Sequence, residues 1–80
     1  MSQSEISVLV KFFASLRQYG PRKEKIKLKA GSKIKNILEK YSIPSQENLV
    51  IIVNGHPHKT ENYFLNEGDI VAIFPTIAGG

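Results

Sequence analysis

Two strongly apolar strand segments, one near each end of the 80-residue sequence, constrain the fold more than any other feature. Residues 6–12 (ISVLVKF) place an apolar side chain at every second position, so one face of a strand is apolar. Residues 70–74 (IVAIF) are apolar throughout and predict a last strand. Because a chain of this length has one modest core, we expect both segments to pair in the centre of a single sheet.

The segment that follows the first strand is less regular. Residues 13–21 carry Leu16 and end in a Gly-Pro break, which predicts a single helical turn or an ordered loop. In residues 24–29, Ile26 and Leu28 alternate with lysines. This alternation predicts a second strand that is half exposed to solvent.

A helix is predicted to begin after Gly31, with Ser32 capping its free amide groups and Pro44 ending it. Four side chains at the spacing i, i+3, i+4 and i+7 form one apolar stripe: Ile34, Ile37, Leu38 and Tyr41.

The remaining elements complete a mixed sheet. Residues 49–53 are apolar on both faces and precede an Asn-Gly turn signal, residues 63–65 form a short apolar element, and residues 66–69 form a turn. The order strand, strand, helix, strand, short element, strand predicts an α+β fold with one helix on one face of the sheet. This is the β-grasp arrangement familiar from ubiquitin. We expect residues 1–74 to form that domain and residues 75–80 a flexible C-terminal tail.

Composition excludes several kinds of site. The chain has no cysteine, which removes disulfides, thiolate metal ligands and cysteine nucleophiles and fits a reducing compartment. It shows no signal peptide and no apolar run long enough to span a bilayer, so we expect a cytoplasmic protein without a membrane partner. His56 and His58 are too few for a metal site.

A hydrolytic triad is also unsupported by the pattern. Ser15, His58 and Asp69 are the right residue types, but nothing in their spacing brings them together. Gly68 and Asp69 are better interpreted as turn residues before the last strand.

Positive charge is concentrated in the first half of the chain. The net charge is +4, and nine of the eleven Lys and Arg residues lie between Arg17 and Lys40. The favoured interpretation is a solvated edge strand, because lysines that alternate on an outer strand prevent edge-to-edge pairing. A basic docking face for an acidic protein or an anionic substrate remains an alternative. Nucleic-acid binding is least favoured, because the aromatic residues are not interleaved with the charges.

The final Gly79-Gly80 pair suggests chemistry at the carboxyl terminus. A terminal carboxylate is ionised and unreactive at neutral pH, so it needs activation by a partner, for example adenylation by ATP. Glycine has no Cβ and lets a chain thread a narrow channel into a foreign active site. Pro75 cannot donate a ladder hydrogen bond and would help to separate the tail from the sheet.

Three segments together resemble the sulfur carriers of the ThiS/MoaD group, β-grasp relatives of ubiquitin that end in Gly-Gly. They are FFASLR at residues 12–17 with Gly20, VNG at residues 53–55, and LNEGDIVAIFP at residues 65–75 leading to AGG at residues 78–80. The Phe-Ala-x-Leu-Arg segment and the Phe-Pro before the tail are more similar to the small subunit of molybdopterin synthase than to the carrier of thiamine thiazole synthesis.

The resemblance implies a sulfur-donating subunit that is not a catalyst alone and binds no cofactor. A MoeB/ThiF-like enzyme would use ATP to adenylate Gly80, and a sulfur donor such as a cysteine desulfurase or rhodanese would convert it to a thiocarboxylate. The large subunit of molybdopterin synthase would then receive the tail. A carrier for thiazole or another sulfur pathway, a ubiquitin-like protein modifier and a plain interaction domain are the alternatives.

The resemblance also assigns residues to partner contact. In the tail these are Pro75, Ile77 and Ala78, with Gly79 providing clearance for Gly80. In the domain, the positions that match partner-facing ones in the family are Phe13, Arg17, Pro57 and Phe74. Pro57 stands where an aliphatic residue is more usual, and Phe13 and Phe74 could equally be core residues.

Overall fold

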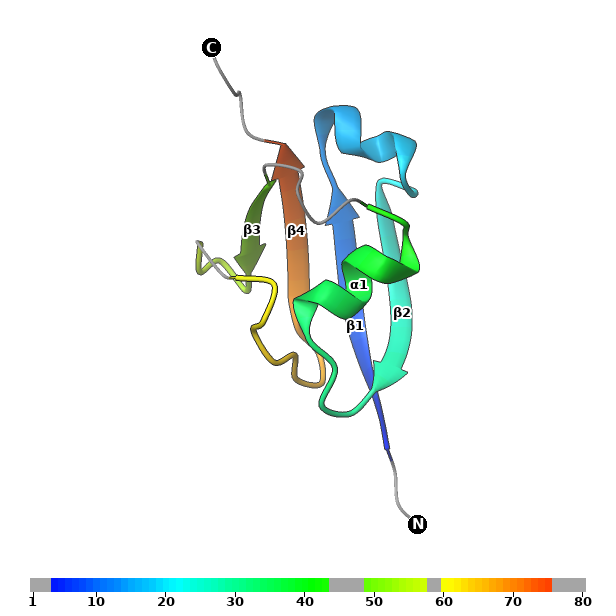
Figure 1. Cartoon of the computed structure of the whole chain (residues 1–80), viewed down its shortest axis with the longest axis vertical. Helices are drawn as coiled ribbons and strands as arrows, with labels where there is room; N and C mark the ends of the chain where they lie inside the picture. Colours follow the sequence, from blue (N-terminus) through cyan, green and yellow to red (C-terminus); the bar gives the residue numbers. More distant parts are fainter. Residues whose placement is uncertain (1–3, 44–48, 58–59, 76–80) are drawn as a thin grey trace.

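One four-stranded mixed sheet organises the chain in a computed structural model that describes residues 4–43, 49–57 and 60–75. The strands are β1 (Glu5–Phe12), β2 (Lys23–Lys29), β3 (Leu49–Val53) and β4 (Ile70–Pro75), in the order β2-β1-β4-β3. β1 and β4 are parallel in the centre, and each pairs with an antiparallel edge strand (Figure 1). The expected central pairing and the β-grasp fold are therefore confirmed.

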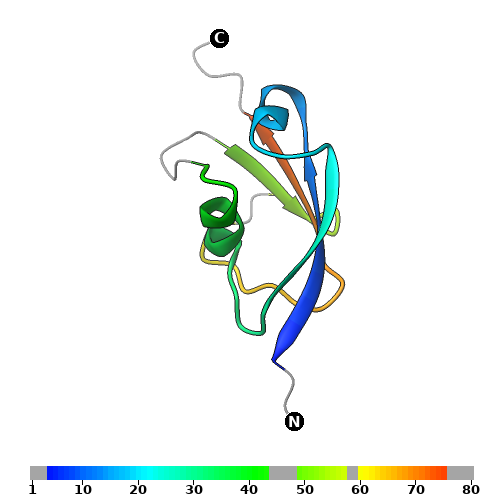
Figure 2. The ribbon, with the colours of Figure 1, turned by 90° about the vertical axis from the view of Figure 1, so that its right-hand side faces the viewer.

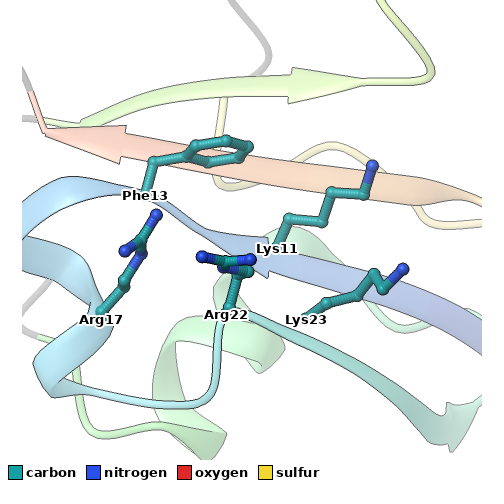
Figure 3. A pocket seen from close by; sticks show the side chains of 5 residues that line it. All are labelled: Lys11, Phe13, Arg17, Arg22 and Lys23. Carbon is teal, nitrogen blue, oxygen red and sulfur yellow. The ribbon is translucent and has the colours of Figure 1, made fainter.

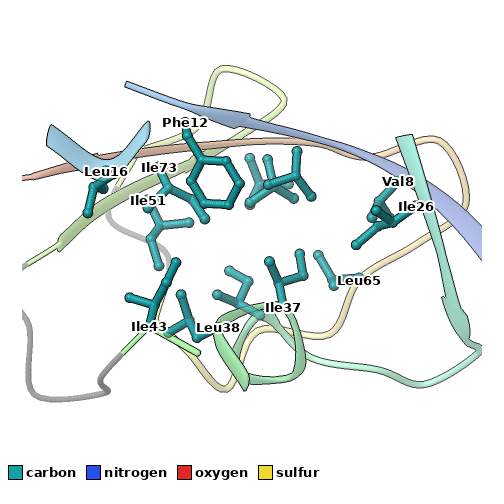
Figure 4. Packing of buried hydrophobic residues seen from close by; sticks show 14 residues of the cluster. Val8, Phe12, Leu16, Ile26, Ile37, Leu38, Ile43, Ile51, Leu65 and Ile73 are labelled. Carbon is teal, nitrogen blue, oxygen red and sulfur yellow. The ribbon is translucent and has the colours of Figure 1, made fainter. Parts of the chain in front are cut away.

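The helix α1 (Ile34–Lys40) covers one face of this sheet, and no element among the described residues covers the other, open face (Figures 1 and 2). Figure 4 shows the buried side chains between the sheet and α1. The period-two pattern of the strands places alternate residues on the helix side, and these residues are buried: Val8, Val10, Phe12, Ile51, Val53, Val71 and Ile73. Facing them on α1 are Ile34, Ile37 and Leu38, as predicted from the stripe.

The prediction that Ser32 caps α1 is wrong by one residue. Lys33 is the N-cap residue, and its N–H donates to the Asn36 side-chain oxygen at 2.7 Å. The backbone of Ser32 is already engaged, because its carbonyl accepts the N–H of Leu65 at 2.8 Å. The short element around residue 64 pairs with Lys33 and thus shifts the start of the helix.

The end of α1 also differs from the prediction that Pro44 stops it. The helix ends at Lys40, and Ser42 adopts a left-handed conformation with φ of 60°. The N–H of Ser42 bonds to the Glu39 carbonyl at 3.1 Å, and the N–H of Ile43 bonds to the Leu38 carbonyl at 2.8 Å. This is a Schellman motif, which satisfies the free carbonyls before the chain reaches Pro44, a residue outside the described ones.

The predicted helical turn after β1 is the 3₁₀ helix η1 (Ala14–Gln18), which buries Leu16 over the end of the sheet. At the close of this segment, Gly20 allows a tight approach, because a Cβ there would lie 2.7 Å from a ring carbon of Phe12. β4 runs through Pro75, which lies opposite Leu49 and is one residue beyond the predicted strand. Within the described residues, no helix is long and apolar enough to cross a membrane.

Candidate functional site

The end of the sheet from which the tail departs combines three segments of the chain. β1 and β4 are parallel, so both finish at this end, and η1 follows β1 directly beside them (Figure 1). The N–H of Phe13 donates to the carbonyl of Ile73 at 3.2 Å, which fixes the start of the η1 segment against β4. The last described residue, Pro75, is therefore next to η1.

Phe13 and Phe74 stack on each other at this end. Their ring centroids are 4.2 Å apart and their planes differ by 13°. Both side chains are half-buried, and neither belongs to the core, where the neighbouring residues Phe12 and Ile73 take the inward positions. The rings form an aromatic platform on the face of the sheet that α1 does not cover, and such a partly exposed pair is suited to contact another protein.

The same open face continues as an apolar surface along the sheet. Val50, Ile52 and Ala72 are half-buried there, and Ile70 is 41% exposed. These residues alternate with the core residues of β3 and β4, so they point away from α1. An apolar sheet face without a covering layer among the described residues is a feature of surfaces that bind partners.

Arg17 lies in the last turn of η1 and lines a pocket of about 330 Å³ beside the platform. Figure 3 shows Phe13 and four cationic side chains, contributed by β1, η1, the start of β2 and the connection just before β2. The lining residues are Lys11, Phe13, Arg17, Arg22 and Lys23. Sequence reasoning singled out Phe13 and Arg17, and it included Arg22 and Lys23 only in the general basic stretch from Arg17 to Lys40. It missed Lys11, because only the pairing of β1 with β2 brings Lys11 beside them.

Pro57 lies toward the opposite end of the sheet from the stacked pair of Phe13 and Phe74. β3 is antiparallel to β4, so its last residue, Val53, pairs with Val71 at the opposite end from Pro75. Pro57 follows the turn after Val53 and is exposed there. The expected tail residues Ile77, Ala78, Gly79 and Gly80 lie outside the described residues.

Asp69 has a structural environment rather than a catalytic one. Its carboxylate accepts the side-chain N–H of Asn54 and the backbone N–H of Asn66, both at 2.8 Å, and only 5% of the residue is exposed. It precedes β4, whereas Ser15 follows the far end of β1, so these two residues lie at opposite ends of the central pair. His58 is outside the described residues, and the interpretation of Asp69 as a turn residue agrees with this geometry.

Metal ligands are not clustered in the described part of the chain. There, no group of three His, Cys, Asp or Glu residues could hold an ion. His56 is exposed, and its backbone closes the turn with Val53.

Comparison with solved structures yields relatives with the same fold. The putative molybdopterin converting factor subunit 1 from Pyrococcus furiosus superposes with a TM-score of 0.71 at 29% identity, covering 90% of this chain and 99% of that one. The small archaeal modifier protein 1 from Methanosarcina acetivorans gives 0.67 at 22% identity, with 98% and 100% covered. Subunit 1 and 2 of the molybdopterin-converting factor from Helicobacter pylori form a complex, and the matching chain gives 0.60 at 24% identity, with 94% and 100% covered.

Among curated protein sequences, none is significantly similar to this one. The sequence model of the ThiS family, in contrast, matches residues 10–80, which include all four strands in whole or in part, α1 and the Gly-Gly terminus. The chain therefore belongs to the ThiS family.

Proposed function

We propose that this chain is a sulfur carrier that serves as the small subunit of molybdopterin synthase. The observation that carries the proposal is the stacked pair of Phe13 and Phe74 on an uncovered apolar face, at the end of the sheet that leads to Gly79-Gly80. Membership of the ThiS family and the likeness to the Pyrococcus furiosus protein support it.

The chemistry takes place at the Gly80 carboxylate. A partner enzyme transfers the AMP part of ATP to this carboxylate and releases pyrophosphate, which converts an unreactive anion into an acyl donor. The outer sulfur of a persulfide on the donor protein then attacks the acyl-adenylate and displaces AMP, and a thiol reductant cleaves the resulting acyl disulfide to leave a thiocarboxylate. In the active site of the large subunit the thiocarboxylate sulfur attacks the pterin precursor, and water then hydrolyses the acyl–sulfur bond, which leaves the sulfur on the pterin and regenerates the carboxylate.

The β-grasp domain contributes docking. The Phe13–Phe74 platform and the apolar face beside it contact the large subunit, while the tail enters its active site. The complex of subunit 1 and 2 from Helicobacter pylori gives a precedent for such a pair. Two half-buried rings that become fully buried on binding would supply much of the affinity, because aromatic anchors dominate protein interfaces.

Intact mass spectrometry tests the carrier step. The full chain is incubated with ATP, an adenylating enzyme and a sulfur donor, beside a version that lacks Gly80. We expect the mass gain of one oxygen replaced by sulfur in the full chain only. The thiocarboxylated chain is then mixed with the large subunit and the pterin precursor, and dithiolene product is expected. Absence of the mass gain, with an adenylating enzyme that is active on its own carrier, would exclude a sulfur carrier.

A thiazole carrier is the nearest alternative, because the matching family model is that of ThiS. Both carriers would show the mass gain, so the receiving enzyme distinguishes them. Restoration of thiazole synthesis but not of molybdopterin synthesis, in extracts that lack their own carriers, would replace the proposal.

A protein modifier is favoured by the likeness of the fold to the small archaeal modifier protein 1. A modifier would join Gly80 to lysine side chains of other proteins. High-mass adducts in cells that disappear when Gly80 is deleted would support this second function.

A further inference from the structure

The basic pocket beside the aromatic platform is a site that the sulfur chemistry does not use. We propose that it binds an acidic segment of the partner protein that receives the tail. Only the identity of this partner rests on the proposed function. The pocket has a volume of about 330 Å³ and is lined by Phe13 and four cations, namely Lys11, Arg17, Arg22 and Lys23.

The positive charges of the pocket repel one another. Lys11 on β1 lies directly opposite Lys23 on β2, and like charges opposite each other destabilise a sheet. The far end of the same strand pair differs, because Glu5 lies opposite Lys29 there. The edge position of β2 gives a reason for a lysine at position 23, but not for a second cation opposite it on the central strand β1.

Among the described residues, no acidic side chain neutralises the pocket. Across the described residues, none of the four cations forms an ion pair with a carboxylate. Glu24 is adjacent to Lys23 in sequence, but its side chain accepts a hydrogen bond from the Tyr41 hydroxyl on the helix side of the sheet. The positive field of the pocket is therefore available to an external anion.

The shape of the site favours a protein segment over a small anion. Arg17, Arg22 and Lys23 are exposed, and Lys11 and Phe13 are only half-buried, so no lining side chain is locked by burial. Such side chains provide attraction without the fixed geometry that a small ligand needs. Several weak contacts along a peptide suit them better, and the adjacent platform can accept an apolar side chain of the same segment.

Nucleic acid fits this pocket less well. Single strands bind through aromatic rings on which bases stack. The pocket has one ring, Phe13, and Phe74 already covers one of its faces.

A titration of the isotopically labelled full chain, followed by NMR, tests the site without any natural partner. The probe is a short peptide of Glu and Asp residues around one Phe, and the matched probe carries Gln and Asn instead. We expect amide shifts at Lys11, Phe13, Arg17 and Arg22 with the acidic peptide only. The double variant Arg17→Gln/Arg22→Gln should weaken binding about fivefold, from two surface charge contacts.

The control variant Lys25→Gln/Lys27→Gln removes the same charge from exposed positions of β2 outside the pocket. It should change the affinity less than about twofold. An equal loss in both double variants would show a general attraction to net charge and overturn the site. Tighter binding of inorganic phosphate or of a single-stranded oligonucleotide at the same amides would overturn the assignment to a protein segment.

The natural partner provides a separate test. If the large subunit binds the wild-type chain, Arg17→Gln/Arg22→Gln should weaken that binding, with a stronger effect at low salt. If the large subunit does not bind at all, the proposed function fails, and the peptide titration still decides whether the pocket recognises acidic segments.

Discussion

At the scale of single residues, Asp69 joins two turns that are distant in sequence. The side-chain oxygen of Asn54 accepts the N–H of Ile70, while its side-chain N–H donates to the Asp69 carboxylate, each at 2.8 Å. Asn54 itself has a φ of 52°, a left-handed conformation that Asn tolerates better than most residues. The Val-Asn-Gly and Asn-Glu-Gly-Asp segments are therefore one structural unit that holds the start of β4.

Replacement of Asp69 by alanine should destabilise the domain strongly. The change removes two hydrogen bonds to a buried carboxylate, for which we expect a loss of about 2–3 kcal/mol in the free energy of unfolding. Urea denaturation measures this loss. Glu67→Ala is the matched control, because Glu67 accepts the N–H of Ser7 at 2.8 Å but is exposed, and it should cost less than about 1 kcal/mol. Similar losses in both variants would contradict the role of Asp69.

Tyr41 connects the end of α1 to β2. Its ring meets Phe12 edge to face at a centroid distance of 4.8 Å, and its hydroxyl donates to Glu24. Burial, and then the hydrogen bond and negative charge of Glu24, raise the pKa of Tyr41 above its ordinary value of 10.0. The folded chain thus holds the phenolic proton more tightly than the unfolded chain does.

The raised pKa of Tyr41 predicts a loss of stability in alkali. Its contribution is complete below pH 10.0, the ordinary value, and declines as the pH rises above it, because the unfolded chain then releases a proton that the folded chain retains. Tyr41→Phe should cost about 1 kcal/mol at neutral pH through the lost hydrogen bond. Urea unfolding of the wild type and of Tyr41→Phe, from neutral pH to above pH 10.0, should show that the difference between their free energies of unfolding shrinks above pH 10.0. A constant difference would count against the Tyr41–Glu24 bond.

At the scale of elements, the C-terminus of α1 is closed by a residue that is poorly suited to its position. Ser42 occupies the left-handed position of the Schellman motif, where glycine is the usual residue. Ser42→Gly should raise the free energy of unfolding by about 0.5–1 kcal/mol. The free energy gained by relieving the left-handed strain exceeds the free energy lost because glycine makes the unfolded chain more flexible. Thermal denaturation should show an increase of about 3–6 °C.

A serine without positive φ provides the control for this change. Ser32 precedes α1 and is not among the residues with positive φ, so Ser32→Gly should give no gain in stability. Equal stabilisation by both substitutions would mean that the strain at Ser42 does not explain the effect.

At the scale of the whole molecule, the strands could be predicted because each carries its own signal. The alternation that buries Val8 and Val10 is local to β1. The central pairing of β1 with β4 follows because a chain of this length has a single core, to which both apolar strands contribute. The capping of α1 could not be predicted, since Ser32 is engaged by Leu65, which is 33 positions further along the chain. The basic pocket could not be predicted either, because it depends on the strand register that sets Lys11 opposite Lys23.

One face of the sheet packs against α1 and the other carries the stacked pair, and this distinction predicts how aromatic substitutions affect binding. Phe74 belongs to the stacked platform near the tail, so Phe74→Ala should leave the core intact and weaken binding to the large subunit at least about tenfold. Loss of the stack and of apolar area should lower the free energy of unfolding by about 1–2 kcal/mol. Calorimetric titration and urea denaturation measure the two effects separately.

Phe64→Ala is the matched control, because it removes an equal ring from another surface. Phe64 is 60% exposed, and its ring lies 4.9 Å from the Lys33 ammonium group beside the start of α1. If the chain docks through the open face near the tail, the affinity of Phe64→Ala for the large subunit should stay within about twofold of the wild-type affinity. If Phe64→Ala weakened binding as much as Phe74→Ala, the contact would extend to the start of α1, and the open sheet face alone would not be the docking surface.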